Sequence, residues 1–147
     1  MQNLPVVPTK APSLLKLGAC FIYDTLVVIA ISFFCGWLFL WLVGDATHGV
    51  KRYALQLFLW LSVGVYFVWC WSKGGQTLAM QAWKLKVVDQ ELQLLTIKTA
   101  VARYVLACVS LILFGLGFLW AIVDRDKLFL HDRLLKSKII QSHLRST

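Results

Sequence analysis

The stretch RYVLACVSLILFGLGFLWAIVDRDKLFLHDR, from Arg103 to Arg133, decides the fold of this 147-residue chain. After the arginine, the twenty residues from Tyr104 to Val123 carry no charge, and two glycines, Gly115 and Gly117, lie within them. A helix needs about 20 apolar residues to cross the hydrocarbon core of a bilayer. A dense cluster of aspartate, arginine, lysine and histidine follows. The stretch therefore predicts a membrane-embedded segment, with charged groups at its end that are candidates for ligand or partner contacts.

The composition of the whole chain indicates the same class of protein. Hydrophobic residues make up 59% of it and charged residues only 15%, whereas a soluble domain carries about 25% charged residues. Fifteen lysines and arginines outweigh seven aspartates and glutamates. Such an excess is typical of positive-inside topology and of contact with anionic lipid headgroups. We expect no nucleic-acid partner, because the cations bracket apolar runs and form no separate basic face.

Two more apolar runs precede the first quoted stretch. One extends from about residue 17 to 43, with Asp24 as its single charge, and the other runs from Tyr53 to Ser72 with no charge. The predicted fold class is an all-α membrane protein, a small helical bundle. It has two full transmembrane helices, an interrupted third segment at 104–123 that is re-entrant or spanning, and a short cytoplasmic β-ribbon. Residues 1–13 form a proline-containing leader, 14–141 the membrane domain and 142–147 a tail.

Local signals fix several boundaries between these runs. Ser13, Thr77 and Thr96 are placed to cap the starts of helices. Trp83–Asp89 (WKLKVVD) and Lys136–Gln141 (KSKIIQ) are strand-like, and each is too short to be stable alone. We therefore predict that these two pieces pair into a two-stranded ribbon, which requires both to lie on the same side of the membrane.

The distribution of cations bears on whether the third run crosses completely. Three complete crossings would place seven cations on the N-terminal side and eight on the other, whereas cytoplasmic segments normally carry an excess. If the third run turns back near its glycines, thirteen cations lie on one side and two, Lys51 and Arg52, on the other. The length of the run favours a crossing and the charge count favours a return. We favour the return and expect the N-terminus and tail in the cytoplasm.

The four cysteines lie within apolar runs, and no two are closer than fifteen positions. Without a CxxC pair, the sequence indicates neither a zinc site nor a disulfide framework. We expect buried free thiols, no metal and no cofactor. Most aromatic residues, Trp71 among them, are expected at the membrane interfaces, and Trp60 within the second span is expected to pack against another helix.

Asp24 and Arg103 are the leading candidates for a polar site. A carboxylate within a span is costly and indicates a functional site by default, so Asp24 is either a proton or cation site or half of a structural ion pair near the inner interface. Arg103 has three alternatives: it reaches the interface, pairs with Asp24, or binds an anionic headgroup. We expect a cation or hydrogen-bond donor from another segment beside Asp24, with Arg103 as the first choice.

The charged cluster after the third run contributes further candidates. His131 and Asp132 have the residue types of a general base and its orienting carboxylate, but neighbours on a helix point about 100° apart. No nucleophile motif accompanies them, so we expect no enzyme. The charges of the tail are expected in a solvated face or in contact with a partner strand. The candidate polar or ion-binding site comprises Lys16, Asp24, Arg103, Asp124 and Asp132.

Three segments carry a resemblance to a known family. LLKLGACFIYD places Lys16 eight residues before Asp24, GGQTLAMQAWKLKVVD precedes a predicted strand, and Arg103 opens the run that ends in GLGFLW and LHDR. On these motifs the chain resembles the RDD family of bacterial integral membrane proteins over about residues 14–141. It departs from the family pattern in two places: Lys16 stands where the family has an arginine, and Ala79-Met80 replaces a Gly-Lys pair.

The resemblance implies a multi-pass protein of the bacterial inner membrane. The molecular role of the family is unsettled, and the transport proposed for it includes unidentified small ligands and cation/proton exchange. The competing hypothesis is a non-transporting scaffold or accessory protein that binds a partner through its cytoplasmic face. Three short membrane segments enclose a transport pathway poorly, so transport would require a homo-oligomer or another protein partner.

Overall fold

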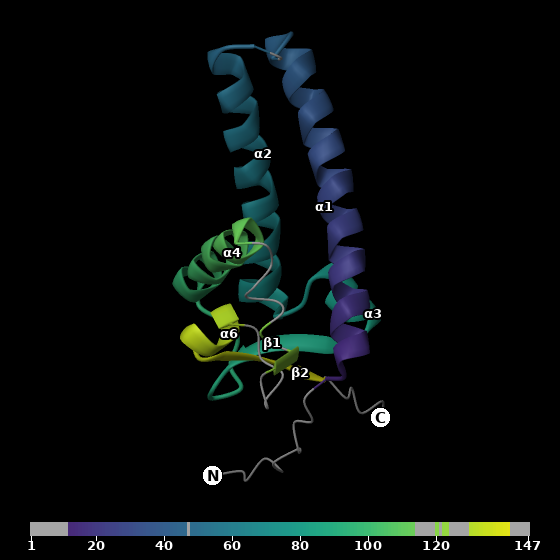
Figure 1. Ribbon diagram of the computed structural model, residues 1–147, viewed down its shortest axis with the longest axis vertical. Helices are drawn as coiled ribbons and strands as arrows, with labels where there is room; N and C mark the ends of the chain where they lie inside the picture. Colours follow the sequence, from purple (N-terminus) through teal and green to yellow (C-terminus); the bar gives the residue numbers. More distant parts are fainter. Residues whose placement is uncertain (1–11, 47, 114–119, 121, 124–129, 142–147) are drawn as a thin grey trace.

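The computed structural model describes residues 12–46, 48–113, 120, 122–123 and 130–141. Two long helices, α1 (Leu14–Val43) and α2 (Val50–Trp69), lie side by side and form what we call the hairpin (Figure 1). The remaining elements gather at the end of the hairpin opposite its turn, and we call them the base. They are η1 (Cys70–Gly74), α3 (Leu78–Ala82), β1 (Leu85–Asp89), α4 (Ile97–Ile112), α6 (Leu130–Leu134) and β2 (Ser137–Gln141).

Helix α1 begins and ends at the residues that local chemistry predicts. The Ser13 hydroxyl accepts a hydrogen bond from the Lys16 backbone N–H and caps its start. Its 30 residues span about 45 Å, which exceeds a hydrocarbon core of about 30 Å. Gly44, with φ of 81°, ends the helix and donates its N–H to the Leu40 carbonyl. Helix α1 therefore ends at the residue where the first apolar run was predicted to end.

Helix α2 continues as a π-helical turn, η1, and its last turn leads into the base. The combined helix, Val50–Gly74, is longer than the predicted Tyr53–Ser72 at both ends. Gly75 ends it in the left-handed conformation, with φ of 68°. A Cβ atom there would lie 2.9 Å from both Leu94 Cδ2 and the Val87 carbonyl oxygen. Glycine is thus required by both the backbone conformation and the close approach of β1.

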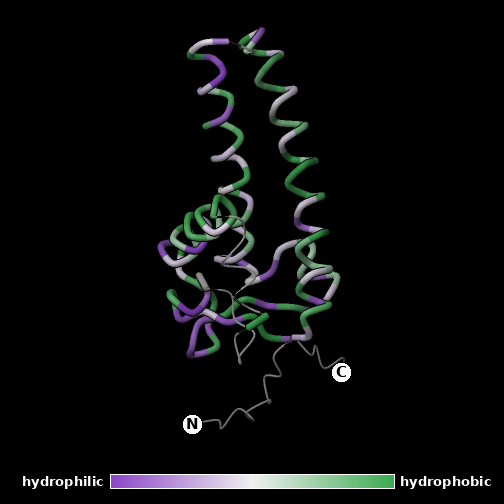
Figure 2. Tube along the Cα trace, in the orientation of Figure 1, coloured by the Kyte–Doolittle hydropathy of each residue, from purple (hydrophilic) through white to green (hydrophobic). Residues whose placement is uncertain are grey.

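Both helices of the hairpin are long and apolar enough to cross a membrane. Hydrophobic residues extend along the length of α1, while hydrophilic residues gather in the base and near the turn between α1 and α2 (Figure 2). Large apolar side chains point outward, for example Phe33, which is 77% exposed, and Trp41, which is 72% exposed. The described part of the hairpin therefore offers an apolar outer surface.

Strands β1 and β2 pair antiparallel, which confirms the predicted ribbon. Val87 faces Ile139 and Lys86 faces Ile140 in the register. Each strand begins one or two residues later than predicted, because Lys84 and Lys136, with φ of 53° and 54°, form left-handed turns immediately before the strands. The outer edge of β1 is also covered, since Val87 donates its N–H to the Gly75 carbonyl and Gln76 donates to the Leu85 carbonyl, each at 2.7 Å.

The ribbon joins two copies of one local motif. Each copy is a five-residue helix, a left-handed lysine and a five-residue strand: α3, Lys84 and β1, then α6, Lys136 and β2. Corresponding positions are 52 residues apart, and KLKVVD corresponds to KSKIIQ. Val87 and Ile139 are themselves corresponding positions and face one another, so an approximate twofold axis passes between them.

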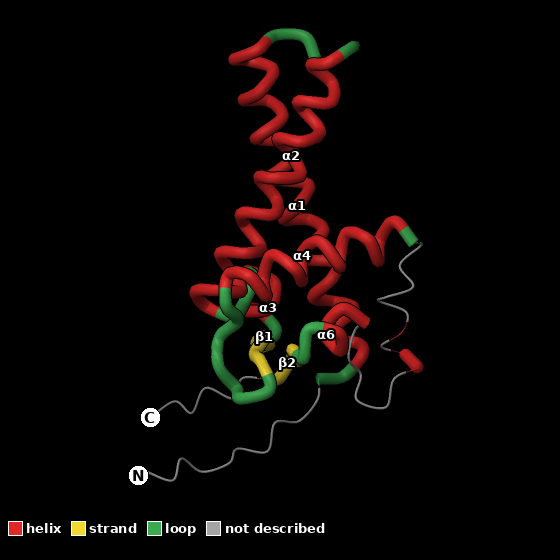
Figure 3. Tube along the Cα trace, turned by 90° about the vertical axis from the view of Figure 1, so that its left-hand side faces the viewer, coloured by secondary structure: helices red, strands yellow, loops and turns green. Residues whose placement is uncertain are grey.

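The ribbon also constrains the third apolar run. Because β1 precedes α4 and β2 follows the run, the chain leaves the base and returns to it. Helix α4 crosses α2 and does not extend the hairpin as a third parallel helix (Figure 3). It ends at Ile112, and the predicted glycine turn at Gly115 and Gly117 lies outside the described residues.

Helices α2 and α4 approach each other closely at Gly64. A Cβ atom on Gly64 would lie 2.8 Å from Tyr104 Cε1, so the absence of a side chain lets the tyrosine ring pack directly on α2. The Tyr104 hydroxyl donates to the Trp60 carbonyl at 2.9 Å, and the Trp60 and Tyr104 ring centroids are 5.4 Å apart. The predicted packing role of Trp60 is confirmed.

Candidate functional site

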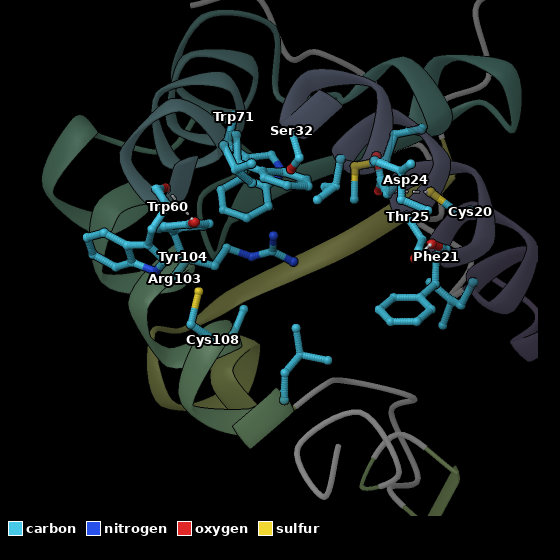
Figure 4. Close-up of a pocket in the computed structure, with 18 of the residues that line it drawn as sticks. Cys20, Phe21, Asp24, Thr25, Ser32, Trp60, Trp71, Arg103, Tyr104 and Cys108 are labelled. Atoms are coloured by element: carbon cyan, nitrogen blue, oxygen red, sulfur yellow. Dashed lines mark hydrogen bonds between the residues drawn. The ribbon is translucent and has the colours of Figure 1, made fainter. Parts of the chain in front are cut away.

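A cavity of about 590 Å³ lies where α1, α2, α4 and the ribbon meet. Its volume falls within the range of about 300–1,000 Å³ that is typical of ligand pockets. Figure 4 shows that the lining side chains come from different elements, with Asp24 and Cys20 on α1 and Arg103, Tyr104 and Cys108 on α4. Leu85 of β1 and Ile139 of β2 contribute to the lining from the ribbon.

The walls of this cavity are largely apolar and rich in aromatic rings. Among the described lining residues, Asp24 and Arg103 alone are charged. The five aromatic side chains among them are Phe21, Trp60, Phe67, Trp71 and Tyr104. The arrangement resembles ligand sites in which a few polar groups orient a mainly apolar molecule.

Asp24 lies on the third turn of α1 and its carboxyl group faces the cavity (Figure 4). Its Oδ2 atom accepts a hydrogen bond from the Cys20 thiol, one turn earlier, at 3.8 Å. Its Oδ1 atom is buried and accepts no hydrogen bond within the described residues. Thr77, which is fully buried at the start of α3, is the nearby polar side chain from another segment, and Arg103 acts on the carboxylate only as a charge at longer range.

Arg103 lies on α4 and contacts residues of two other elements. Its Nε donates to Asp132 Oδ1 of α6 at 2.7 Å, and both side chains are almost completely buried, 3% and 0% exposed. The guanidinium carbon lies 4.2 Å from the ring centroid of Trp71, on η1, in a cation–π contact. Ser137, at the start of β2, donates its hydroxyl to the same Asp132 oxygen at 3.0 Å.

The predicted pairing of Arg103 with Asp24 is therefore wrong. The ribbon folds α6 back beneath α4, so Asp132 reaches the guanidinium and takes the position that Asp24 was expected to occupy. The expected solvated position of the tail charges is also wrong for Asp132, which is completely buried. Direct contact between the buried carboxylate and the buried guanidinium offsets part of the desolvation cost of both groups.

Of the two other candidates from the sequence, one does not line the cavity and the other is not described. Lys16 is half-buried on the first turn of α1 and is not among the described residues that line the cavity. Asp124 lies outside the described residues. Sequence reasoning missed the roles of Trp71, Thr77 and Ser137. Trp71 was expected at the membrane interface, and only the folded arrangement shows that its ring lies beneath Arg103.

The cysteines and the acidic residues offer little for metal chemistry. All four cysteines are free, and Cys20 is buried while the other three are half-buried. Across the described ranges, no group of three or more histidine, cysteine, aspartate or glutamate side chains is close enough to hold a metal ion. The candidate chemistry of the site therefore rests on the Asp24 carboxylate and on the Arg103–Asp132 pair.

Comparison with known proteins places this site in a family context. Residues 15–136 match the RDD family. The chain belongs to the RDD family. The matched segment includes Lys16, Asp24, Arg103 and Asp132, so the whole described polar site lies within the part of the chain shared with this RDD family. Membership and the two long apolar helices together point to a membrane location. No curated protein and no solved structure matches the chain.

Proposed function

We propose that this RDD-family protein binds a small ligand in the cavity beside Asp24 and takes part in its transport, or in cation/proton exchange, across the bacterial inner membrane. One observation carries the proposal: a carboxylate within an apolar helix faces a cavity of ligand size. Carboxylates inside membrane spans are expensive and commonly mark ion or substrate pathways. The proposal includes no catalytic step and no cofactor.

The proposed orientation places the base and its ribbon at the cytoplasmic surface. Its support is the pairing of β1 with β2, which brings the segments before and after the third run to the same end of the molecule. With that arrangement, Lys51 and Arg52 at the hairpin turn are the two cations on the opposite side, as the positive-inside tendency favours. The third run is then re-entrant, and the protein crosses the bilayer fully with α1 and α2.

Transport in this proposal requires more than one copy or a partner protein. Large apolar residues on both long helices, such as Phe33 on α1 and Val65 on α2, point away from the molecule. Two helices cannot enclose a pathway, so another subunit must supply the remaining wall. An anionic lipid is also a proposed partner, because exposed Lys73 lies at the end of a second, apolar groove of about 500 Å³ between α2 and α4.

A second candidate function is a scaffold or accessory protein that binds a partner through the base. Three leucines of the base support it, because Leu92, Leu94 and Leu134 are exposed although they lie beside the packed ribbon. Exposed apolar groups of this kind are suited to protein contacts. The scaffold hypothesis differs from the transport hypothesis in requiring no function for Asp24.

Ion flux in proteoliposomes tests the transport proposal. We expect the wild-type protein to carry a proton-coupled or cation flux, and Asp24→Asn to reduce it by about tenfold or more, because the variant keeps the shape of the side chain and removes its charge. Asp89→Asn is the matched control, since Asp89 lies at the end of β1 and does not line the cavity. Equal flux in the wild type and Asp24→Asn, or none in either folded protein, would contradict the proposal and favour the scaffold.

A further inference from the structure

Arg103 and Asp24, the two charged residues among the described lining of the cavity, differ in the partners that balance their charges. Arg103 is neutralised at contact distance by Asp132, and the two side chains are buried together. Asp24 has a thiol as its hydrogen-bond donor, and one of its carboxylate oxygens is buried without a partner. Among the described residues, the three charged groups of the site, Asp24, Arg103 and Asp132, sum to one negative charge, which is located at Asp24. A carboxylate in an apolar span needs a neutralising partner.

The shape and lining of the cavity limit what that partner can be. A bare sodium, magnesium or calcium ion requires several oxygen ligands, whereas the described walls offer few oxygens besides Asp24, Thr25 and Ser32. The volume of about 590 Å³ is also far larger than a single ion needs. An ion of this kind would leave most of the cavity unfilled and would remain poorly coordinated.

Aromatic rings provide the remaining surface that a cation can use. Trp60 and Tyr104 line the cavity from α2 and α4, and ring faces attract organic cations, particularly when these are removed from water. The described apolar lining, which includes Val28, Val63 and Leu111, suits a hydrocarbon body attached to such a cation. The Asp24 carboxylate, which lines the cavity, would accept a hydrogen bond from an ammonium N–H.

From this geometry we infer that the cavity binds an organic ammonium cation with an apolar body, with the ammonium group at Asp24. The inference rests on the proposed function, since it names the chemical class of the ligand for the same site. It assigns Arg103 a positioning role: its charge is held by Asp132, and its contact with Trp71 holds that ring against the cavity. An anionic ligand is disfavoured because the carboxylate that would repel it has no compensating cation in contact among the described residues.

Binding of three compounds of matched size tests this inference. The purified full-length protein in lipid nanodiscs is titrated calorimetrically with 1-naphthylmethylammonium, 1-naphthylacetate and neutral 1-naphthalenemethanol, and the heat from empty nanodiscs is subtracted. We expect the ammonium compound to bind about tenfold or more tightly than the other two. Asp24→Asn should remove this preference, whereas Asp24→Glu and the control Asp89→Asn should retain it.

Two results would overturn the inference. One is tighter binding of the naphthylacetate, which would show that Arg103 sets the effective charge of the cavity. The other is an absence of specific ammonium binding by wild-type protein whose circular dichroism shows it to be folded. Flux that depends on Asp24 without ammonium binding would leave the transport proposal standing and remove only the ligand class. Ammonium binding without flux would retain the ligand class and contradict transport.

Discussion

The hairpin and the base of this protein are stabilised in different ways. Along the hairpin, large apolar side chains such as Phe33, Trp41 and Val65 point outward. In the base, Leu85 and Val87 are completely inaccessible, and a buried arginine–aspartate pair links α4 to α6. An apolar surface carries no hydrophobic penalty in lipid, whereas the base must bury its own core. We therefore expect side-chain packing in the base to contribute more to the stability of the fold than packing along the hairpin.

The candidate cavity is lined by residues from both regions. The cavity is formed where the lower part of the hairpin meets the base, so Asp24 belongs to an apolar helix and Arg103 to a packed polar network. A ligand that binds between them contacts both regions at once. Paired substitutions, one in each region, therefore test whether side chains of the base contribute more to the free energy of unfolding than side chains of the hairpin.

The largest expected effect is the loss of the buried cation. Arg103→Ala should lower the free energy of unfolding by about 3–5 kcal/mol, because it leaves Asp132 buried without its contact charge. Arg52→Ala, at the exposed turn end of the hairpin, is the matched control and should change stability by less than about 0.5 kcal/mol. Denaturant titration of the reconstituted proteins, followed by circular dichroism, measures both.

A double variant tests whether the stability lost in Arg103→Ala comes from breaking the ion pair or from lost packing alone. Replacing both charges, as Arg103→Met with Asp132→Leu, should recover most of the stability lost in Arg103→Ala, because no uncompensated charge stays buried. If Arg103→Ala and Arg52→Ala were equally stable, the ion pair would not stabilise the base, and the contrast between the two regions would fail.

An intermediate effect is expected from two helix glycines. Gly64→Ala should destabilise the protein by about 1–3 kcal/mol, because the new methyl group would lie against the Tyr104 ring, where the Cβ atom meets Cε1 at 2.8 Å. Gly36→Ala, in the hairpin, meets only Leu59 Cδ2 at 4.0 Å and should be neutral or stabilising by up to about 1 kcal/mol. Thermal unfolding of the two variants in the same lipid provides the comparison, and equal losses would contradict it.

The smallest effect is expected on the outer face of the hairpin. Phe33→Ala should change the free energy of unfolding by less than about 0.5 kcal/mol, because the ring is 77% exposed and leaves no internal cavity when it is removed. The measurement is denaturant titration in nanodiscs at low protein density. A loss above about 2 kcal/mol would instead show that this face packs against a second subunit, as the proposed oligomer allows.

The sequence by itself determined the features that depend on local chemistry. The apolar runs predicted the two long helices, and Ser13, Thr77 and Thr96 cap helices as expected. The ribbon was also predictable, because WKLKVVD and KSKIIQ each need a partner for their backbone groups. Membership of the RDD family followed from motifs that are contiguous in the chain. All of these signals act over a few turns of helix or one strand.

The tertiary structure alone decided which groups meet. Arg103 and Asp132 are 29 residues apart, and their contact depends on the path of the chain back from α4 to α6. The sequence predicted Arg103 beside Asp24 and placed Asp132 in a solvated face or against a partner strand, because hydrophobicity and helical periodicity do not record the direction in which a distant helix returns. That choice of partner also decides the charges at the cavity: Asp132 contacts Arg103, and Asp24 faces the cavity with no ion-pair partner among the described residues.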